Sequence, residues 1–173
     1  MTILITGGTG KTGSQLARLL DIANIPYVIA SRSGSAPAPS EGVKFDWFDE
    51  STYRNPFDAR SDIDKVYLVF PSVFDPGLIA KSFIDFAISK GVKRFVLLSA
   101  SGLEKGGNGS GKAHDYLAES GADYIVLRPT WFIGADAIPL LILISSYLRS
   151  IISQKILALP SYPLFGILTA FLL

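Results

Sequence analysis

A glycine-rich turn near the N-terminus limits most strongly what this chain can fold into. The β-forming run from Thr2 to Thr6 leads into Gly-Gly-Thr-Gly-Lys-Thr-Gly, residues 7–13, and an apolar pattern typical of a helix follows. Glycine suits such a turn because its backbone adopts a positive φ, approaches a ligand closely and lets the helix pack against the strand. The free N–H groups at the start of the helix favour a phosphate. The stretch predicts a strand, an anion-binding turn and a helix.

The spacing of the glycines distinguishes two kinds of phosphate-binding turn. Gly8, Gly10 and Gly13 fit the dinucleotide pattern G-x-G-x-x-G, and Gly7 with Gly10 and Gly13 fits the related G-x-x-G-x-x-G. A P-loop needs glycine five residues before Gly10, where this chain has Ile5. We therefore expect a dinucleotide here. The residues expected to bind it are Gly7, Thr9, Gly10, Lys11, Thr12 and Gly13.

Five further short apolar runs alternate with helical patterns along the chain. The expected strands are residues 27–30, 43–45, 66–70, 95–98 and 124–127. Alternation of buried strands with helices predicts the α/β class and a Rossmann-like, doubly wound parallel sheet. We assign residues 1–134 to one NAD(P)-binding domain.

The end of the second expected strand bears on which dinucleotide is bound. An acidic residue there favours the ribose of NAD, whereas arginine favours the 2′-phosphate of NADP. The chain reads Ala30-Ser31-Arg32-Ser33, without a carboxylate. Arg32 therefore predicts NADP(H), with Ser31, Ser33 and Lys11 as helpers. The alternative is an ordinary surface arginine.

The ends of the third and fourth expected strands offer more cofactor contacts, because ligands of this fold lie beyond the carboxyl ends of the strands. Asp46 is expected to accept from the adenine amino group, with Trp47 against the ring. Alternatively, Asp46 caps the next turn and Trp47 packs in the core. The residues expected on the nicotinamide side are Phe70, Pro71 and Ser72.

The expected nicotinamide side lacks the usual acid for carbonyl reduction. Short-chain dehydrogenases commonly carry a tyrosine four residues before a lysine, but here Tyr116 precedes Ser120 and Tyr124 precedes Arg128 at that distance. Ser99 and His114 are the candidates for orienting or protonating a substrate, although a lone histidine is as often a surface or capping residue. A single histidine and no cysteine disfavour a metal centre.

The charge balance and the N-terminus limit partners and location. With 16 Lys and Arg against 15 Asp and Glu, the chain has no general attraction for nucleic acid. The first apolar run is short and has no basic region before it, which disfavours a secretory signal. A cytoplasmic protein is the default expectation.

Four stretches together resemble the NmrA-like atypical short-chain dehydrogenases, and among them the fungal festuclavine and agroclavine dehydrogenases of ergot alkaloid biosynthesis. They are residues 6–13, 45–50, 91–101 and 127–132. The resemblance implies NADPH-dependent reduction of a C=N iminium in an ergoline precursor, a small-molecule alkaloid substrate. NmrA-like proteins also include NADP-sensing regulators that bind dinucleotide without catalysis, which is the alternative function.

An iminium substrate agrees with the missing tyrosine. Its carbon already carries the positive charge that a carbonyl acquires only by protonation, so hydride adds without a general acid. The protein must then place the nicotinamide and supply an aromatic wall for the ring system. Phe70, Trp131 and Phe132 are the candidates for this wall.

The composition changes after residue 134. From Ala135 to Leu173 only Asp136, Arg149 and Lys155 are charged, and the prolines and glycine in the apolar run 156–173 weaken it as a membrane-spanning helix. Three interpretations compete: a membrane anchor, a helix that covers the sheet, or a tail produced by truncation or a misread intron. We favour the third, and expect weak NADPH binding with little turnover.

Overall fold

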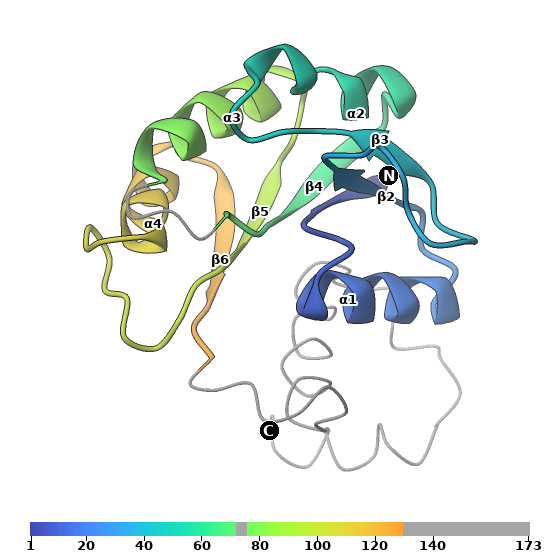
Figure 1. Cartoon of the computed structure of the whole chain (residues 1–173). Coiled ribbons are helices and arrows are strands. Elements are labelled where there is room, and N and C mark those ends of the chain that lie inside the picture. The colour runs from blue at the N-terminus through green and yellow to red at the C-terminus, as the bar shows by residue number, and fades with distance from the viewer. Residues whose placement is uncertain (72–75, 130–173) are drawn as a thin grey trace. The chain divides into compact units, whose positions relative to one another are not determined.

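The computed structural model describes residues 1–71 and 76–129, which contain a six-stranded parallel sheet (Figure 1). Its strands are β1 (Thr2–Thr6), β2 (Tyr27–Ser31), β3 (Gly42–Lys44), β4 (Ile63–Leu68), β5 (Arg94–Leu98) and β6 (Asp123–Leu127). The helices are α1 (Lys11–Ile22), α2 (Asn55–Ala59), α3 (Gly77–Ser89) and α4 (Ser110–Glu119), with a short 3₁₀ turn, η1 (Glu50–Thr52). The predicted α/β class is confirmed.

The strand order is β3-β2-β1-β4-β5-β6. The chain runs outward from β1 to β3 and then returns to place β4 on the other side of β1, so the order reverses between β1 and β4. This is the doubly wound arrangement that the strand and helix alternation predicts. In this fold ligands bind at the carboxyl ends of the strands beside the reversal.

Helices cover both faces of the sheet, with α1 on one side and α3 and α4 on the other (Figure 1). Leu4 of β1 packs in the core that contains Phe83 of α3 and Leu117 of α4. Successive residues of a strand face opposite sides, so Ile3 and Ile5 face the side of α1. All three side chains are fully buried, which explains why β1 is apolar throughout.

An aromatic cluster fills the core beneath the end of β3. Trp47 is 8% exposed, and its ring lies 5.1 Å from that of Phe83 and 4.6 Å from that of Phe70. The Tyr53 hydroxyl donates to the Trp47 carbonyl at 2.9 Å. Of the two alternatives for Trp47, the structure therefore shows packing in the core, and the expected contact with adenine is wrong.

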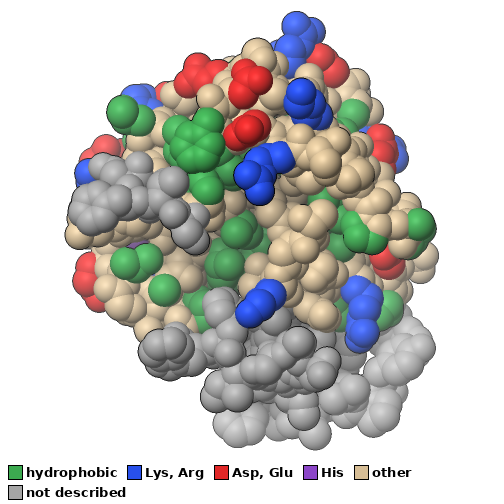
Figure 2. Space-filling model, viewed as in Figure 1, with side chains coloured by type: hydrophobic (Ala, Val, Ile, Leu, Met, Phe, Trp, Pro, Cys, Tyr) green, Lys and Arg blue, Asp and Glu red, His purple; other side chains and the backbone are tan. Residues whose placement is uncertain are grey.

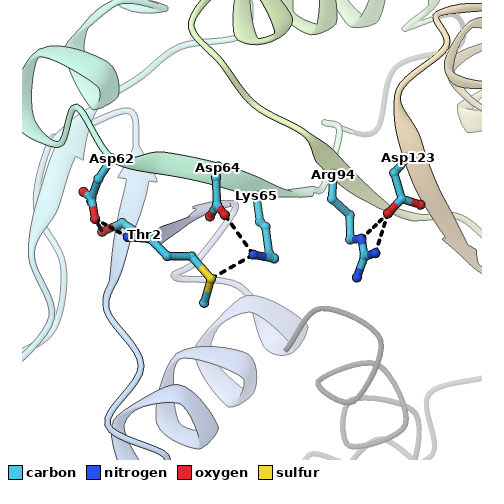
Figure 3. A network of polar contacts seen from close by, with 7 residues as sticks. Thr2, Asp62, Asp64, Lys65, Arg94 and Asp123 are labelled. Carbon is cyan, nitrogen blue, oxygen red and sulfur yellow. Dashed lines mark hydrogen bonds and ion pairs between the residues drawn. The ribbon is translucent and has the colours of Figure 1, made fainter. Parts of the chain in front are cut away.

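Polar side chains hold together the amino ends of the strands (Figure 3). The Thr2 hydroxyl donates to Asp62 at 2.8 Å, and Arg94 of β5 pairs with Asp123 of β6. These contacts lie at the edge of the sheet opposite the glycine turn. The polar residues at this end thus fasten neighbouring strands, and the carboxyl edge is where the chain presents its turns to a ligand.

Charges of both signs lie side by side over the helices in the upper part of the view in Figure 2. Arg54, the N-cap of α2, forms an exposed ion pair with Asp58 of that helix, and Lys81 pairs with Asp85 within α3, each pair four residues apart. None of the helices described is both long and apolar enough to cross a membrane.

Candidate functional site

The glycine turn joins the end of β1 to the start of α1. Gly7 has a φ of +65°, and the Gly10 N–H donates to the Gly7 carbonyl at 2.9 Å. Gly10 is the N-cap of α1 and provides no side-chain hydrogen bond to the helix, whose first turn contains no acidic residue. The first N–H groups of α1 are therefore not capped by a side chain, which suits an anionic ligand.

Close packing requires the last glycine of the turn. A Cβ on Gly13 would lie 2.4 Å from the Gly7 carbonyl oxygen and 2.6 Å from the Gly8 Cα, both of which are backbone atoms. A Cβ on Gly10 would lie 3.1 Å from the same oxygen. The glycines thus keep the turn tight and leave its backbone open to a phosphate, so the residues present fit a dinucleotide.

Thr6 ties β1 to β4 where the strand order reverses. Its hydroxyl donates to the Tyr67 carbonyl at 2.9 Å and accepts from the Val69 N–H at 2.8 Å. The sequence patterns considered above did not indicate a role for Thr6. A hydroxyl that ends a strand buried on both faces is the signal that indicates such a role, because buried polar groups need partners.

Tyr67 of β4 supports the turn from within the sheet, a role that the sequence patterns did not indicate either. Its side chain is 1% exposed and forms a side-chain hydrogen bond with Thr12, the second residue of α1. Burial raises the pKa of Tyr67 to about 12, and the hydrogen bond to Thr12 lowers it only in part. The neutral phenol therefore holds the N-terminus of α1 beside β4.

The loop after β2 presents Arg32 to solvent, and Lys11 at the start of α1 is exposed too. The Ser31 hydroxyl donates to the Ser35 carbonyl at 2.7 Å, and the Ser33 and Ser35 hydroxyls lie 2.7 Å apart. The two serines thus fix the loop in which Arg32 lies. Within residues 1–71 and 76–129 no ion pair engages Arg32.

Asp46 follows β3 and is half-buried. Its Oδ1 accepts from the Phe48 N–H at 3.0 Å, and its own N–H donates to Thr52 Oγ1 at 2.9 Å. The carboxylate thus caps the turn after β3, as the second alternative expects. A contact between its other oxygen and adenine stays a prediction.

Part of the predicted nicotinamide side lies outside the described residues, namely Ser72, Trp131 and Phe132, as does the domain boundary after residue 134. Phe70 and Pro71 directly follow β4 and are half-buried, and the Phe70 ring packs on Trp47. Their contact with the cofactor stays a prediction.

Ser99 and His114 have different neighbours. Ser99 follows β5, is 8% exposed, and its Oγ lies 2.9 Å from that of Ser110, the first residue of α4. His114 lies one turn further along the same helix face, about 6 Å along the axis. Its ring lies 5.8 Å from that of Tyr124 of β6. The structure thus pairs Ser99 with Ser110, which we did not predict, and His114 with Tyr124.

Arg128 fixes the loop between β5 and α4. Its Nη2 donates to the Ser101 carbonyl at 2.9 Å and to Glu104 Oε1 at 2.7 Å. The Ser101 N–H donates in turn to the Pro129 carbonyl at 2.9 Å. The loop that begins at Ser99 is therefore held against the end of β6.

Tyr116 contacts the outer helix α3. Its hydroxyl donates to Asp85 and accepts from Lys81 Nζ.

Among the described residues, no three His, Asp or Glu side chains are grouped so as to hold a metal ion.

Comparison with known proteins shows the family of this chain. Residues 7–143 match the model of a family described as NAD(P)H-binding. The chain belongs to this NAD(P)H-binding family. The match begins at the glycine turn, and it confirms the dinucleotide-binding domain that the glycine spacing predicts.

Curated proteins of known name are similar to this chain. The chain is 46% identical over 140 residues to festuclavine synthase I of Penicillium roqueforti, and 45% identical over 136 residues to agroclavine dehydrogenase of Claviceps purpurea. Each match covers 76% of this chain, and 48% and 47% of the relatives. The predicted resemblance is confirmed, and the chain spans about half the length of these curated relatives.

A solved structure supports the fold of this NAD(P)H-binding chain. ChuY, an anaerobillin reductase from Escherichia coli O157:H7, superimposes with a TM-score of 0.63 at 20% identity, covering 75% of this chain and 72% of ChuY. At this identity the likeness shows the Rossmann-like fold alone.

Proposed function

We propose that this chain binds NADPH in preference to NADH and acts in an oxidoreductase that reduces a C=N iminium of an ergoline precursor. The observation that carries the proposal is the identity of 46% to festuclavine synthase I over 140 residues, 76% of this chain. The names of the relatives support the substrate class. The chain spans about half the length of these relatives, so the activity of the whole protein is also proposed.

The loop after β2 supports the preference for NADPH. The exposed Arg32 follows a strand end without a carboxylate, and the hydroxyls of Ser31 and Ser33 hold its loop in place. A guanidinium pairs well with a phosphate, whereas the free ribose hydroxyls of NADH donate hydrogen bonds and need an acceptor in the protein. Lys11 adds a second exposed cation at the start of α1.

The surroundings of Tyr116 support an iminium rather than a ketone. Its hydroxyl is engaged by Asp85 and Lys81 of α3. Reduced nicotinamide supplies the hydride when the cofactor is bound. The task of the chain's own residues is then placement: the glycine turn holds the diphosphate, and the loop fixed by Arg128 places Ser99 at the end of β5.

A fluorescence titration with NADPH and NADH tests the cofactor preference. We expect tighter binding of NADPH, and a loss of about tenfold or more in NADPH affinity for Arg32→Asp. Arg18→Asp, at an exposed arginine of α1, serves as the control with an equal change of charge. Equal affinity of the wild type for the two cofactors would refute the preference.

The reaction is tested with an ergoline iminium and NADPH, by following the oxidation of the cofactor. Turnover of an iminium by the whole protein, but not of the matching ketone, is the expected result. Tight NADPH binding without hydride transfer to any iminium, together with a partner protein whose binding depends on the NADP/NADPH ratio, would favour the regulatory alternative.

A further inference from the structure

Phe48, two residues after Asp46, is an aromatic side chain that is exposed to solvent. Trp47 is 8% exposed, whereas Phe48 is 67% exposed. Phe48 lies in the tight turn from Asp46 to Asp49, and Phe45 and Trp47 before it pack in the core. The exposed Phe48 ring projects away from the core. From this arrangement we propose that Phe48 covers one face of the adenine ring of the bound dinucleotide, an inference that rests on the proposed cofactor binding.

The backbone around Phe48 is fixed although its ring is exposed. The Phe48 N–H donates to Asp46 Oδ1 at 3.0 Å, and the Asp49 N–H donates to the Asp46 carbonyl at 3.1 Å. On the other side, the Trp47 carbonyl accepts from the buried Tyr53 hydroxyl. A large apolar ring held in this way loses little freedom when a flat ligand packs on it.

The neighbouring loop places Phe48 on the adenosine side of the site. Strand β3 pairs with β2 in parallel, with Ser31 opposite Lys44, and the Phe45 N–H donates to the Ser31 carbonyl at 2.8 Å. Phe48 thus follows β3 just beyond the loop that carries Arg32. Adenine and the 2′-phosphate are attached to the same ribose, so a phosphate at Arg32 brings the base to the end of the adjacent strand.

Asp46 completes the recognition of the base. One carboxylate oxygen orients the Phe48 backbone. An ionised carboxylate accepts several hydrogen bonds, so the same group also accepts from an amino group in the plane of the base. A ring face and an acceptor at one turn match the π-face and the exocyclic amino group of adenine.

The probes that test this inference are the two halves of the cofactor. Adenosine 2′,5′-bisphosphate carries the base and both phosphates of its half, and reduced nicotinamide mononucleotide carries the other half. Phe48→Ala should weaken the binding of the adenosine half and of NADPH about tenfold, which is the size typical of an aromatic ring stacked on a base. The binding of the nicotinamide half should not change.

Two further variants make the result specific. Phe48→Tyr keeps an aromatic face and should bind the adenosine half like the wild type. Leu78→Ala removes another exposed apolar side chain, 83% exposed on α3, and should bind every probe like the wild type. Because Phe48 is exposed, Phe48→Ala should also keep the thermal midpoint of unfolding.

The outcomes separate this inference from the proposed function. Unchanged binding of the adenosine half by Phe48→Ala, with NADPH still bound by the wild type, overturns the role of Phe48 alone. Self-association of the wild type that Phe48→Ala abolishes, with equal nucleotide binding by both, assigns the ring to a contact between copies and overturns it too. A wild type that binds no dinucleotide overturns the proposed function itself.

Discussion

Gly13 illustrates, at the scale of single residues, a constraint that comes from packing and from ligand binding together. In Gly13→Ala the new Cβ would lie 2.4 Å from a backbone oxygen that no side-chain rotation can move. We expect a loss of about 1–3 kcal/mol in the free energy of unfolding and loss of NADPH binding, because the turn must open. Denaturant unfolding and nicotinamide fluorescence measure the two effects.

A matched glycine serves as the control for this prediction. A Cβ on Gly102, in the loop after β5, would meet no heavy atom within 4 Å of those described, and the residue has no positive φ. Gly102→Ala should therefore unfold like the wild type. Wild-type NADPH affinity in Gly13→Ala would show that the turn is not the binding site.

Tyr67 predicts a stability change at high pH. In the unfolded chain the phenol ionises near its ordinary pKa of 10.0, whereas in the folded protein burial raises the pKa to about 12. The stabilisation is complete below pH 10 and decreases as the pH rises toward 12, by about 2 kcal/mol for this group. Tyr67→Phe lacks the ionisation, so its unfolding free energy should decline less steeply between pH 9 and about pH 12. Parallel pH profiles of the two proteins would contradict the assignment.

At the scale of elements, the loop between β5 and α4 is held by Arg128, the residue after β6. Arg128 holds this loop through the Ser101 carbonyl and Glu104. In Arg128→Gln we expect faster hydrogen exchange and faster proteolysis across residues 100–106, while the sheet stays folded. Arg54→Gln, which removes the exposed ion pair between the N-cap of α2 and Asp58, should leave this loop as protected as in the wild type.

The boundaries of elements also differ from their expected positions for physical reasons. The expected strand 66–70 is observed as β4, Ile63–Leu68. It begins earlier because Ile63 and Lys65 pair with Thr2 and Ile3 of β1, so the ladder includes charged residues. Its ladder ends at Leu68, after which the Val69 N–H donates to the hydroxyl of Thr6. The ends of a strand thus depend on the hydrogen-bond partners of its backbone, and a hydrophobic pattern does not show these partners.

On the scale of the whole molecule, a dinucleotide bound as proposed would contact the ends of β1, β2 and β3 and so link elements that are distant in sequence. A ligand that binds only the folded state adds about 2.7 kcal/mol of stability at a concentration of 100 times its Kd. At equal concentrations we expect NADPH to raise the thermal midpoint more than NADH. Arg32→Asp should abolish the difference, and equal shifts in the wild type would refute the preference.

Local sequence patterns were enough to predict the type of sheet and its anion-binding turn. The spacing of Gly7, Gly10 and Gly13, and the alternation of strands with helices, predict the doubly wound sheet and its anion-binding turn. Both signals depend on neighbours in the chain, because backbone geometry fixes the period of a helix, a strand and a tight turn. The absence of a carboxylate beside Arg32 is a local observation of the same kind.

The tertiary structure fixes which groups meet between segments that are distant in the chain. Thr6 bonds to a residue 61 positions away, and Arg128 to one 24 positions away. It also decided that Trp47 is buried while Phe48 faces solvent, because the orientation of the turn after β3 depends on α3 and Tyr53 packing beneath it. Such partners are set by the order of the strands, and a local pattern contains no information about them.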